Sequence, residues 1–163
     1  MIEVHKNLFV GAETDEHAIR GLSGWFVIHA CKDPYHRQAL GYTGRAAPKA
    51  HPEYLLAHRD GCLILNLVDV DNVSFISPVI IDAALEAIAA NIACKKVLVH
   101  CNQGQSRSPS IALLYLLRHT TRFESLTQGN ALSAFGAIYP PFMPARGMAD
   151  FVRLNWQRYA SPA

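Results

Sequence analysis

Residues 97–117, VLVHCNQGQSRSPSIALLYLL, contain two apolar runs joined by a short polar loop. The first run, residues 97–99, stops at His100, and its continuous apolar character is typical of a strand buried on both faces. Ser108 and Pro109 then form a helix start signal, because serine caps helices well and proline loses nothing in a first turn. The stretch therefore predicts a strand, a tight loop and a helix, in that order.

Other segments of the chain predict the rest of an α/β sheet. Continuous apolar runs that indicate strands occur at Leu8–Val10, Trp25–Ala30 and Cys62–Leu67. Helical signals occur from Ser77-Pro78 to about residue 92, from Ser125 to Ile138, and from about Gly147 to Gln157. This alternation predicts a central, mostly parallel sheet of four to five strands flanked by helices.

Residues 31–60 depart from this pattern. The segment is rich in Gly, Pro, His and Arg, has little periodicity, and could hold a short helix near 52–58. Long irregular segments inside compact domains are usually functional or mobile. We expect it to form part of the wall of a site, within a single domain that covers residues 1–163.

Composition excludes several classes of protein. Half of the residues are hydrophobic, 17% are charged and the net charge is +2, which is typical of a globular domain and gives no support for nucleic-acid or membrane binding. The N-terminus lacks a signal-peptide pattern, and no apolar run approaches the ~20 residues that span a bilayer. The four cysteines form no close-spaced framework, so we expect reduced thiols in a cytoplasmic protein.

The loop CNQGQSR, residues 101–107, has the composition of an anion site. Backbone N–H groups of such a loop can converge on an anion, and the positive end of the following helix points to the same place. Gly104 permits the sharp turn, and Arg107 offers a planar fork for two phosphate oxygens. The same surroundings favour the thiolate of Cys101, and Ser108 could donate to that sulfur. The pattern predicts a nucleophile beneath a bound oxyanion.

HCNQGQSRS resembles the His-Cys-x5-Arg-Ser/Thr signature of the protein tyrosine phosphatase superfamily. The wider stretch 97–117 is similar to the dual-specificity branch, as is NLFVGAETD near the N-terminus. IYPPFMPARGMADFVRLNW resembles the last helix of that branch more loosely. The resemblance covers most of the chain, and residues 31–60 are the main departure. Rhodanese-like domains also place a cysteine loop after a strand, but usually without this Ser-Arg-Ser.

The resemblance implies a dual-specificity phosphatase-like fold and a cysteine-dependent phosphatase that needs no cofactor. Cys101 would attack phosphorus and form a phosphocysteine, and Ser108 would stabilise the sulfur as it leaves. The phosphate would be bound by the loop residues Asn102, Gln103, Gly104, Gln105, Ser106 and Arg107. His100 would order the loop by hydrogen bonding, although a plain buried histidine describes it equally well.

The resemblance also requires a general acid on a loop after another strand, about thirty residues before the cysteine. LNLVDVDN offers two candidates at that point, Asp69 and Asp71. We favour Asp69, because it lies nearer the predicted strand end. Asp71 fits a loop-capping role better.

A cluster of histidines and cysteines raises the question of a metal. The spacings of His29, Cys31, His36, His51 and His58 match no compact zinc ligand set, so we expect ordinary loop histidines and no metal. Cys31, Cys62 and Cys94 lie on or beside apolar runs and are predicted to be core thiols. Any of them could trap an oxidised Cys101 as a disulfide if it lay close enough.

The loop composition also bears on the substrate. None of the residues between Cys101 and Arg107 is basic, whereas members of the resembled family that cleave inositol phosphates tend to carry lysine in this loop. The resemblance therefore favours a phosphorylated protein or peptide, with phosphotyrosine foremost, and a phosphatase that acts on phosphoinositides or RNA 5′-phosphates is the alternative. Charge could still come from Arg37, Arg45, Lys49 and Arg59 in the irregular segment. Two alternatives to a phosphatase remain: a phosphate-binding pseudophosphatase or interaction module, and a rhodanese-type sulfurtransferase.

Overall fold

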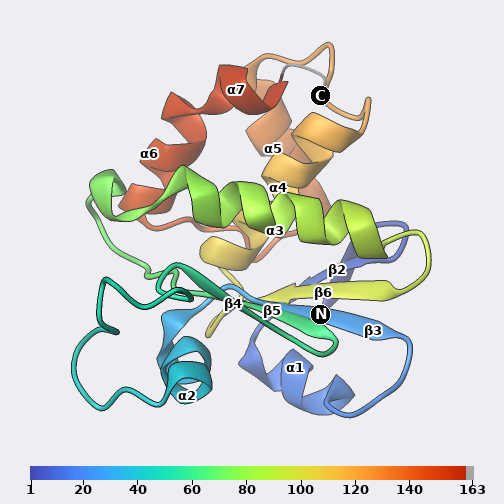
Figure 1. The fold of residues 1–163 in the computed structure, drawn as a ribbon. Helices are drawn as coiled ribbons and strands as arrows, with labels where there is room; N and C mark the ends of the chain where they lie inside the picture. The colour runs from blue at the N-terminus through green and yellow to red at the C-terminus, as the bar shows by residue number, and fades with distance from the viewer. Residues whose placement is uncertain (161–163) are drawn as a thin grey trace.

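A six-stranded sheet forms the middle layer of the computed structural model, which describes residues 1–160 (Figure 1). Its strands are β1 (Ile2–His5), β2 (Leu8–Gly11), β3 (Trp25–His29), β4 (Leu56–Arg59), β5 (Cys62–Leu65) and β6 (Lys96–His100). Across the sheet their order is β1-β2-β6-β3-β5-β4. The three central pairs are parallel, and the two outer pairs are antiparallel. The predicted α/β fold with a mostly parallel sheet is therefore confirmed.

The central strands coincide with the continuous apolar runs of the sequence. β2, β5 and β6 are mostly buried, as expected of parallel strands covered on both faces, whereas β3 is buried only at Ile28 and His29. The sequence did not predict β1 and β4, which lie at the two edges of the sheet. The short helix predicted near 52–58 is wrong: β4 occupies part of that range, and half of its residues are exposed. An edge strand buries little apolar surface, so its sequence carries a weak signal.

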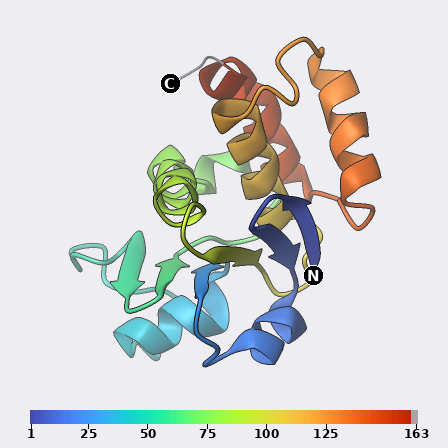
Figure 2. The same cartoon turned by 90° about the vertical axis from the view of Figure 1, so that its right-hand side faces the viewer.

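The helices cover both faces of the sheet. They are α1 (Glu13–Ile19), α2 (Arg37–Leu40), α3 (Pro78–Asn91), α4 (Arg107–His119), α5 (Gln128–Ile138), α6 (Arg146–Leu154) and α7 (Trp156–Ala160), with short helical segments η1 (Lys32–His36) and η2 (Val73–Phe75). Figures 1 and 2 show α1 and α2 on one face and α3 to α7 on the other. No helix among residues 1–160 is long and apolar enough to cross a membrane.

Helix boundaries differ from the predictions in two places. α4 is capped at Ser106 rather than Ser108, so that Arg107 is already helical. The single helix predicted from about Gly147 to Gln157 is two helices, because Asn155 leaves the helical conformation between α6 and α7. The helix predicted over Ser125–Ile138 is present but begins at Gln128, with the Thr127 hydroxyl accepting from the Asn130 amide.

Helix α4 lies at the centre of the molecule. Every residue from Arg107 to Leu117 is buried, because the helix packs against β2 and β6 on one side and against α3, α6 and α7 on others. A helix that is buried all round is held rigidly. The β6–α4 loop is therefore fixed at both ends by the core.

Candidate active site

The loop between β6 and α4 turns at Gly104. This residue has φ +72°, in the left-handed region that glycine adopts at no steric cost. A Cβ at this position would lie 3.0 Å from the backbone of Gly11, at the end of β2. The Cys101 amide donates to the Gly11 carbonyl over 3.4 Å. Glycine is therefore needed at position 104 for the conformation of the loop and for its packing against β2.

The Cys101 side chain lines a cavity of about 500 Å³ around this loop. The residue is 1% exposed. Ser108 Oγ lies 3.2 Å from the Cys101 sulfur and 3.2 Å from the Gly11 carbonyl oxygen. The Ser108 hydroxyl is therefore placed where it can donate to the sulfur.

The Arg107 guanidinium is buried in the wall of the same cavity. Nη1 donates to the Leu67 carbonyl over 3.2 Å, and Nη2 donates to Asn102 Oδ1 over 2.7 Å. These two bonds fix the plane of the guanidinium. Nε has no hydrogen-bond partner within residues 1–160 and lies 3.7 Å from Asp69 Oδ2. An anchored guanidinium with a spare donor is suited to bind an oxyanion.

The two candidate acids lie in different surroundings. Asp69 lines the cavity together with Cys101, and its Oδ1 accepts from Ser106 Oγ over 2.8 Å. Asp71 lines a separate hollow that also contains Arg146 and Asp150. The structure therefore brings Asp69, and not Asp71, to the cavity that holds the thiol.

The other predicted phosphate-binding residues do not all line the cavity. Asn102, Gln103, Gln105 and Ser106 line the cavity, whereas Gly104 is buried behind it. The Gly104 carbonyl accepts from the Tyr139 hydroxyl over 2.8 Å. Burial raises the pKa of Tyr139 to about 12, so that its hydroxyl stays a neutral donor.

Residues 139–145 form hydrogen bonds to the loop between β6 and α4. The sequence did not predict this role. Besides the Tyr139 bond, the Met143 amide donates to the Gln105 carbonyl over 2.9 Å. The Ala145 amide donates to Ser106 Oγ over 3.0 Å. Ser106 thus joins this segment to Asp69, since its hydroxyl accepts from one and donates to the other. The only sequence signal was the rigid YPPFMP stretch at 139–144.

A buried pair of histidines lies directly beneath the loop. His29 Nδ1 and His100 Nε2 are 2.6 Å apart, and the two residues are register partners on β3 and β6. Burial lowers the pKa of His29 to about 4 and that of His100 to about 3, so both rings are neutral at neutral pH. The His29 ring stacks on Tyr35 at 4.2 Å, and the Tyr35 hydroxyl donates to Glu16 over 3.1 Å. His29 is therefore a buried strand residue, in agreement with the strand predicted over Trp25–Ala30, and not one of the loop histidines.

The irregular segment 31–60 touches the candidate site through its first turn. Asn102 Nδ2 donates to the Asp33 carbonyl over 3.1 Å. Two of its predicted cations are engaged inside the segment itself: Arg37 pairs with Asp33 at 2.5 Å, and Arg59 pairs with Glu53 at 2.7 Å. The segment therefore adjoins the loop, but none of its residues lines the cavity, so the prediction that it forms part of the wall is wrong. These two charges are already partnered.

The remaining cysteines and histidines do not form a metal site within residues 1–160. No group of three or more His, Cys, Asp or Glu side chains in that range could hold an ion. Cys31 is fully buried, and burial raises the pKa of its thiol to about 12. Cys62 is half-buried. The prediction of a core thiol is wrong for Cys94, which is exposed because it lies in the turn after α3.

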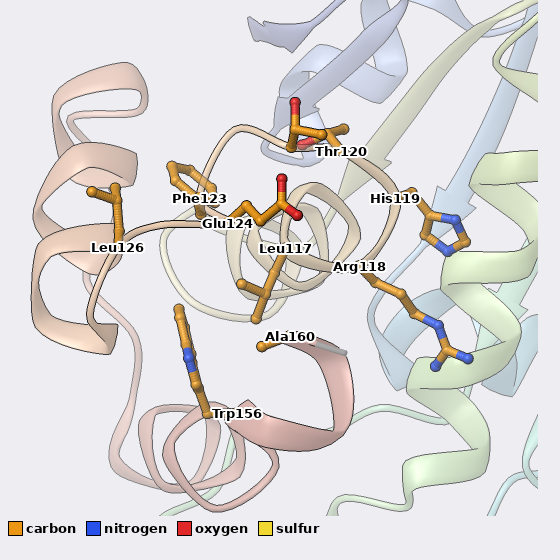
Figure 3. Close-up of a pocket in the computed structure, with 10 residues that line it drawn as sticks. Leu117, Arg118, His119, Thr120, Phe123, Glu124, Leu126, Trp156 and Ala160 are labelled. Carbon is orange, nitrogen blue, oxygen red and sulfur yellow. The ribbon is translucent and has the colours of Figure 1, made fainter. Parts of the chain in front are cut away.

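A second cavity of similar size, about 470 Å³, lies at the other end of α4 (Figure 3). It is lined by the last turn of α4, the loop that follows and α7. Figure 3 shows Leu117, Phe123 and Trp156 around it, with Arg118 and His119 to one side. Cys101, Asp69 and Arg107 are not part of its lining.

Comparison with known proteins gives matches in structure only. No family model matches the chain, and no curated protein matches its sequence. Among solved structures, human DUSP28 is 22% identical with a TM-score of 0.52, covering 98% of this chain and 95% of that one. The human tyrosine phosphatase-like serine/threonine/tyrosine-interacting protein is 16% identical with a TM-score of 0.59, covering 98% and 97%. OH1 from the Orf virus, a tyrosine phosphatase, is 19% identical with a TM-score of 0.57, covering 98% and 86%.

These matches extend along nearly the whole of each chain, so they concern the complete arrangement of sheet and helices. The six-stranded sheet, the buried central helix and the loop between them are all contained in the aligned part. The resemblance inferred from HCNQGQSRS is therefore confirmed at the level of structure, and the chain has the fold of the dual-specificity branch of the protein tyrosine phosphatases.

Proposed function

We propose that the chain is a cysteine-dependent phosphatase that hydrolyses phosphomonoesters through a phosphocysteine intermediate. The observation that carries this proposal is that Cys101, Arg107 and Asp69 line one cavity of about 500 Å³. A thiol nucleophile, a fixed cation and a carboxyl group are the three groups that this chemistry needs. Cys101 and Arg107 belong to one loop, whereas Asp69 lies 32 positions earlier in the sequence, so the fold has to bring the carboxyl group to the loop.

Binding of the phosphate uses the start of α4. The oxyanion sits at the N-terminal end of the helix, where the backbone N–H groups and the helix dipole favour negative charge. Arg107 contributes Nε, which has no hydrogen-bond partner within residues 1–160, together with the N–H groups of its terminal nitrogens that Leu67 and Asn102 leave free. Its other nitrogens stay bound to Leu67 and Asn102, which keep the fork aimed at the cavity.

In the first chemical step the Cys101 thiolate attacks phosphorus. The sulfur–phosphorus bond forms while the bond from phosphorus to the ester oxygen breaks. Asp69, as a carboxylic acid, gives its proton to the departing oxygen, so that an alcohol or phenol leaves. Arg107 and the loop N–H groups stabilise the charge on the other phosphate oxygens.

In the second step a water molecule replaces the alcohol. The Asp69 carboxylate takes a proton from this water as it attacks phosphorus, and the sulfur–phosphorus bond breaks. The Ser108 hydroxyl, 3.2 Å from the sulfur, donates to the thiolate as it leaves. Inorganic phosphate is released, and Cys101 and Asp69 return to their starting states.

The lining of the cavity supports a phosphorylated protein as substrate, with phosphotyrosine foremost. Among the residues that line the cavity, Arg107 is the one cation. Met143, Pro144 and Ala145 make one side of the cavity apolar. A single phosphate on an aromatic ring matches one cation and an apolar wall. A multiply charged inositol phosphate or an RNA 5′-triphosphate would need further cations.

Pre-steady-state kinetics with 4-nitrophenyl phosphate test the proposal. We expect a burst of nitrophenol equal to the enzyme concentration, and acid quenching should trap phosphate on Cys101. Turnover on phosphotyrosyl and phosphoseryl peptides, phosphoinositides and triphosphorylated RNA then ranks the substrates. Stoichiometric binding of vanadate without any burst would support a phosphate-binding pseudophosphatase instead. Release of thiocyanate from thiosulfate and cyanide would support a sulfurtransferase.

A further inference from the structure

A smaller hollow of about 320 Å³ adjoins the candidate phosphate cavity. It lies between the start of α5, the 142–144 segment and α6. Pro144 belongs to the lining of both spaces, so the two spaces are neighbours. The hollow therefore lies beside the phosphate cavity, within reach of the chain of a bound substrate.

The inner surface of this hollow is apolar. Leu132, Phe142 and Val152 contribute to its lining. The two charged residues of the lining, Asp150 and Arg153, pair with each other at 3.3 Å. Because those charges are already partnered, the hollow favours an apolar side chain over a charged one.

One polar group in this lining is left without a partner. Gln128, the first residue of α5, has its Nε2 buried, and no hydrogen-bond partner for it lies in the part of the chain that the structure describes. Buried donors are rarely left unpaired, because each one carries a desolvation cost. Rotation of the Gln128 side chain would turn this N–H group, which is shielded from solvent in the free protein, towards the hollow, where a main-chain carbonyl of a bound polypeptide would supply the missing acceptor.

We propose that this hollow is a specificity subsite for the phosphorylated protein substrate. It takes an apolar side chain, such as leucine or phenylalanine, about two or three residues from the phosphorylated one, and Gln128 donates to a substrate carbonyl beside it. We expect a short spacing because the two spaces share Pro144 in their linings, and an extended chain advances about 3.3–3.6 Å per residue. This inference rests on the proposed phosphatase function.

The first test fills the hollow. Ala149 on α6 is exposed and contributes to the lining, so Ala149→Phe places a ring in the space without disturbing the core. The matched control is Ala160→Phe on α7, which is also exposed and lines the remote cavity of Figure 3. The substrates are phosphotyrosyl peptides that carry one leucine, moved stepwise from four residues before to four residues after the phosphotyrosine, in an otherwise polyalanine background.

We expect the wild-type kcat/KM to rise about tenfold when leucine reaches the preferred position, a size typical of an apolar side chain in a pocket. Ala149→Phe should remove that preference and leave 4-nitrophenyl phosphate turnover unchanged. Ala160→Phe should keep the preference. Equal rates for all leucine positions, or a preference that survives Ala149→Phe, would overturn the subsite. Absence of 4-nitrophenyl phosphate turnover by the wild-type protein would instead overturn the phosphatase function.

The second test removes the unpaired donor. Gln128→Met keeps the length of the side chain but has no N–H group, so thermal unfolding of the free protein should occur at the same temperature or higher. For the preferred peptide, KM should rise several-fold with kcat unchanged, and 4-nitrophenyl phosphate turnover should not move. An unchanged peptide KM would overturn the role of Gln128. A fall in the unfolding temperature would mean that the amide has a partner within the protein, and would overturn it as well.

Discussion

The two ends of helix α4 carry cavities of nearly equal volume but very different chemistry. The cavity at the N-terminal end, about 500 Å³, holds a thiol, a buried guanidinium and a carboxylate. The cavity at the C-terminal end, about 470 Å³, is lined by Leu117, Phe123, Trp156 and the charged side chains of Arg118 and Glu124 (Figure 3). Volume alone would not tell which of them performs chemistry.

The difference follows from the direction of the helix. The N-terminal end of a helix leaves N–H groups free and carries partial positive charge, so it favours an anion and a thiolate. The C-terminal end leaves carbonyl groups free, and cationic side chains such as Arg118 are the usual residues there. Arg118 lies over the Tyr159 ring at 5.9 Å, and His119 stacks on Tyr115 at 4.8 Å, so both have structural contacts. The comparison therefore predicts that substitutions at one end change activity and matched substitutions at the other do not.

Replacing the nucleophile should have the largest effect. Cys101→Ser should lower 4-nitrophenyl phosphate turnover by on the order of 10⁴-fold or more, because a serine hydroxyl ionises far less readily than a thiol. Binding of vanadate, measured by calorimetry, should be partly kept, since backbone groups provide much of the anion site. Appreciable residual turnover would remove Cys101 from the mechanism.

The two arginines of α4 provide the next contrast. Arg107→Lys should lower kcat/KM by about 10³–10⁵-fold, because lysine is a point charge and cannot make the planar contact with two oxygens. Arg118→Lys, at the opposite end, should leave kcat/KM within about twofold of wild type, since surface substitutions away from a site have small effects. Near-equal kinetics of the two variants would mean that Arg107 does not contact the phosphate.

The general acid should be identified by how the rate of its variant depends on the leaving group of the substrate. Asp69→Asn should slow hydrolysis of phosphotyrosine and alkyl phosphates by about 10²–10⁴-fold, and of 4-nitrophenyl phosphate much less, since nitrophenolate departs without a proton. Asp71→Asn should have little effect, because Asp71 lines a different hollow.

Either of two results would change this assignment. If Asp71→Asn shows the leaving-group dependence and Asp69→Asn does not, the loop must rearrange on substrate binding and the two roles are exchanged. If neither variant shows it, the proton comes from another group, and the role implied by the family resemblance fails at this point.

The parts of this arrangement that sequence could predict are those encoded by neighbouring residues. The strand before Cys101, the glycine turn and the buried helix after Arg107 all follow from one stretch of 21 residues, 97–117. The fold class followed because the four inner strands are continuous apolar runs. Asp69 was chosen over Asp71 from its distance to a strand end and from the resemblance, and the structure places it in the cavity with Cys101.

The parts that sequence could not predict depend on contacts between distant segments. His29 and His100, which are 71 positions apart in the sequence, meet only because β3 and β6 pair in a particular register. The bond from Tyr139 to Gly104 spans 35 residues and the bond from Ser106 to Asp69 spans 37. Edge strands β1 and β4 and the short helix α1 were missed because each buries only a few side chains. A local pattern carries no information on these pairings.

The histidine pair beneath the loop should make stability depend on pH. The folded pKa of His29 is about 4 and lies below its unfolded value near 6.5, so the unfolded state takes up the proton first. Its contribution is complete above pH 6.5 and is lost as the pH falls from 6.5 towards 4. His29→Asn, which can still donate to His100 but does not titrate, should lose about 2 kcal/mol less than wild type between pH 6.5 and 5, measured by urea unfolding. His58→Asn, on the exposed edge strand β4, is the control, and an equal change in both variants would contradict this account.

The smallest expected effect concerns the hydroxyl groups of the two residues that flank α4, Ser106 and Thr120. Ser106 is the N-cap residue, and its hydroxyl accepts from Ala145 and donates to Asp69. Thr120 is the C-cap residue, and its hydroxyl donates to the Leu116 carbonyl. Each alanine variant removes one buried or half-buried hydrogen-bonding hydroxyl, so both should lower stability by about 0.5–1.5 kcal/mol.

Only one of the two should also affect catalysis. Ser106→Ala frees Asp69 from the bond that holds its carboxyl group at the cavity, so hydrolysis of an alkyl phosphate should slow by up to about tenfold, with a smaller change for 4-nitrophenyl phosphate. Thr120→Ala should leave both rates unchanged. The selective loss on poor leaving groups separates a positioning role from simple destabilisation, because a partly unfolded enzyme would lose both activities in proportion. If Ser106→Ala slows the two substrates equally, the hydroxyl supports the loop as a whole and does not position the acid.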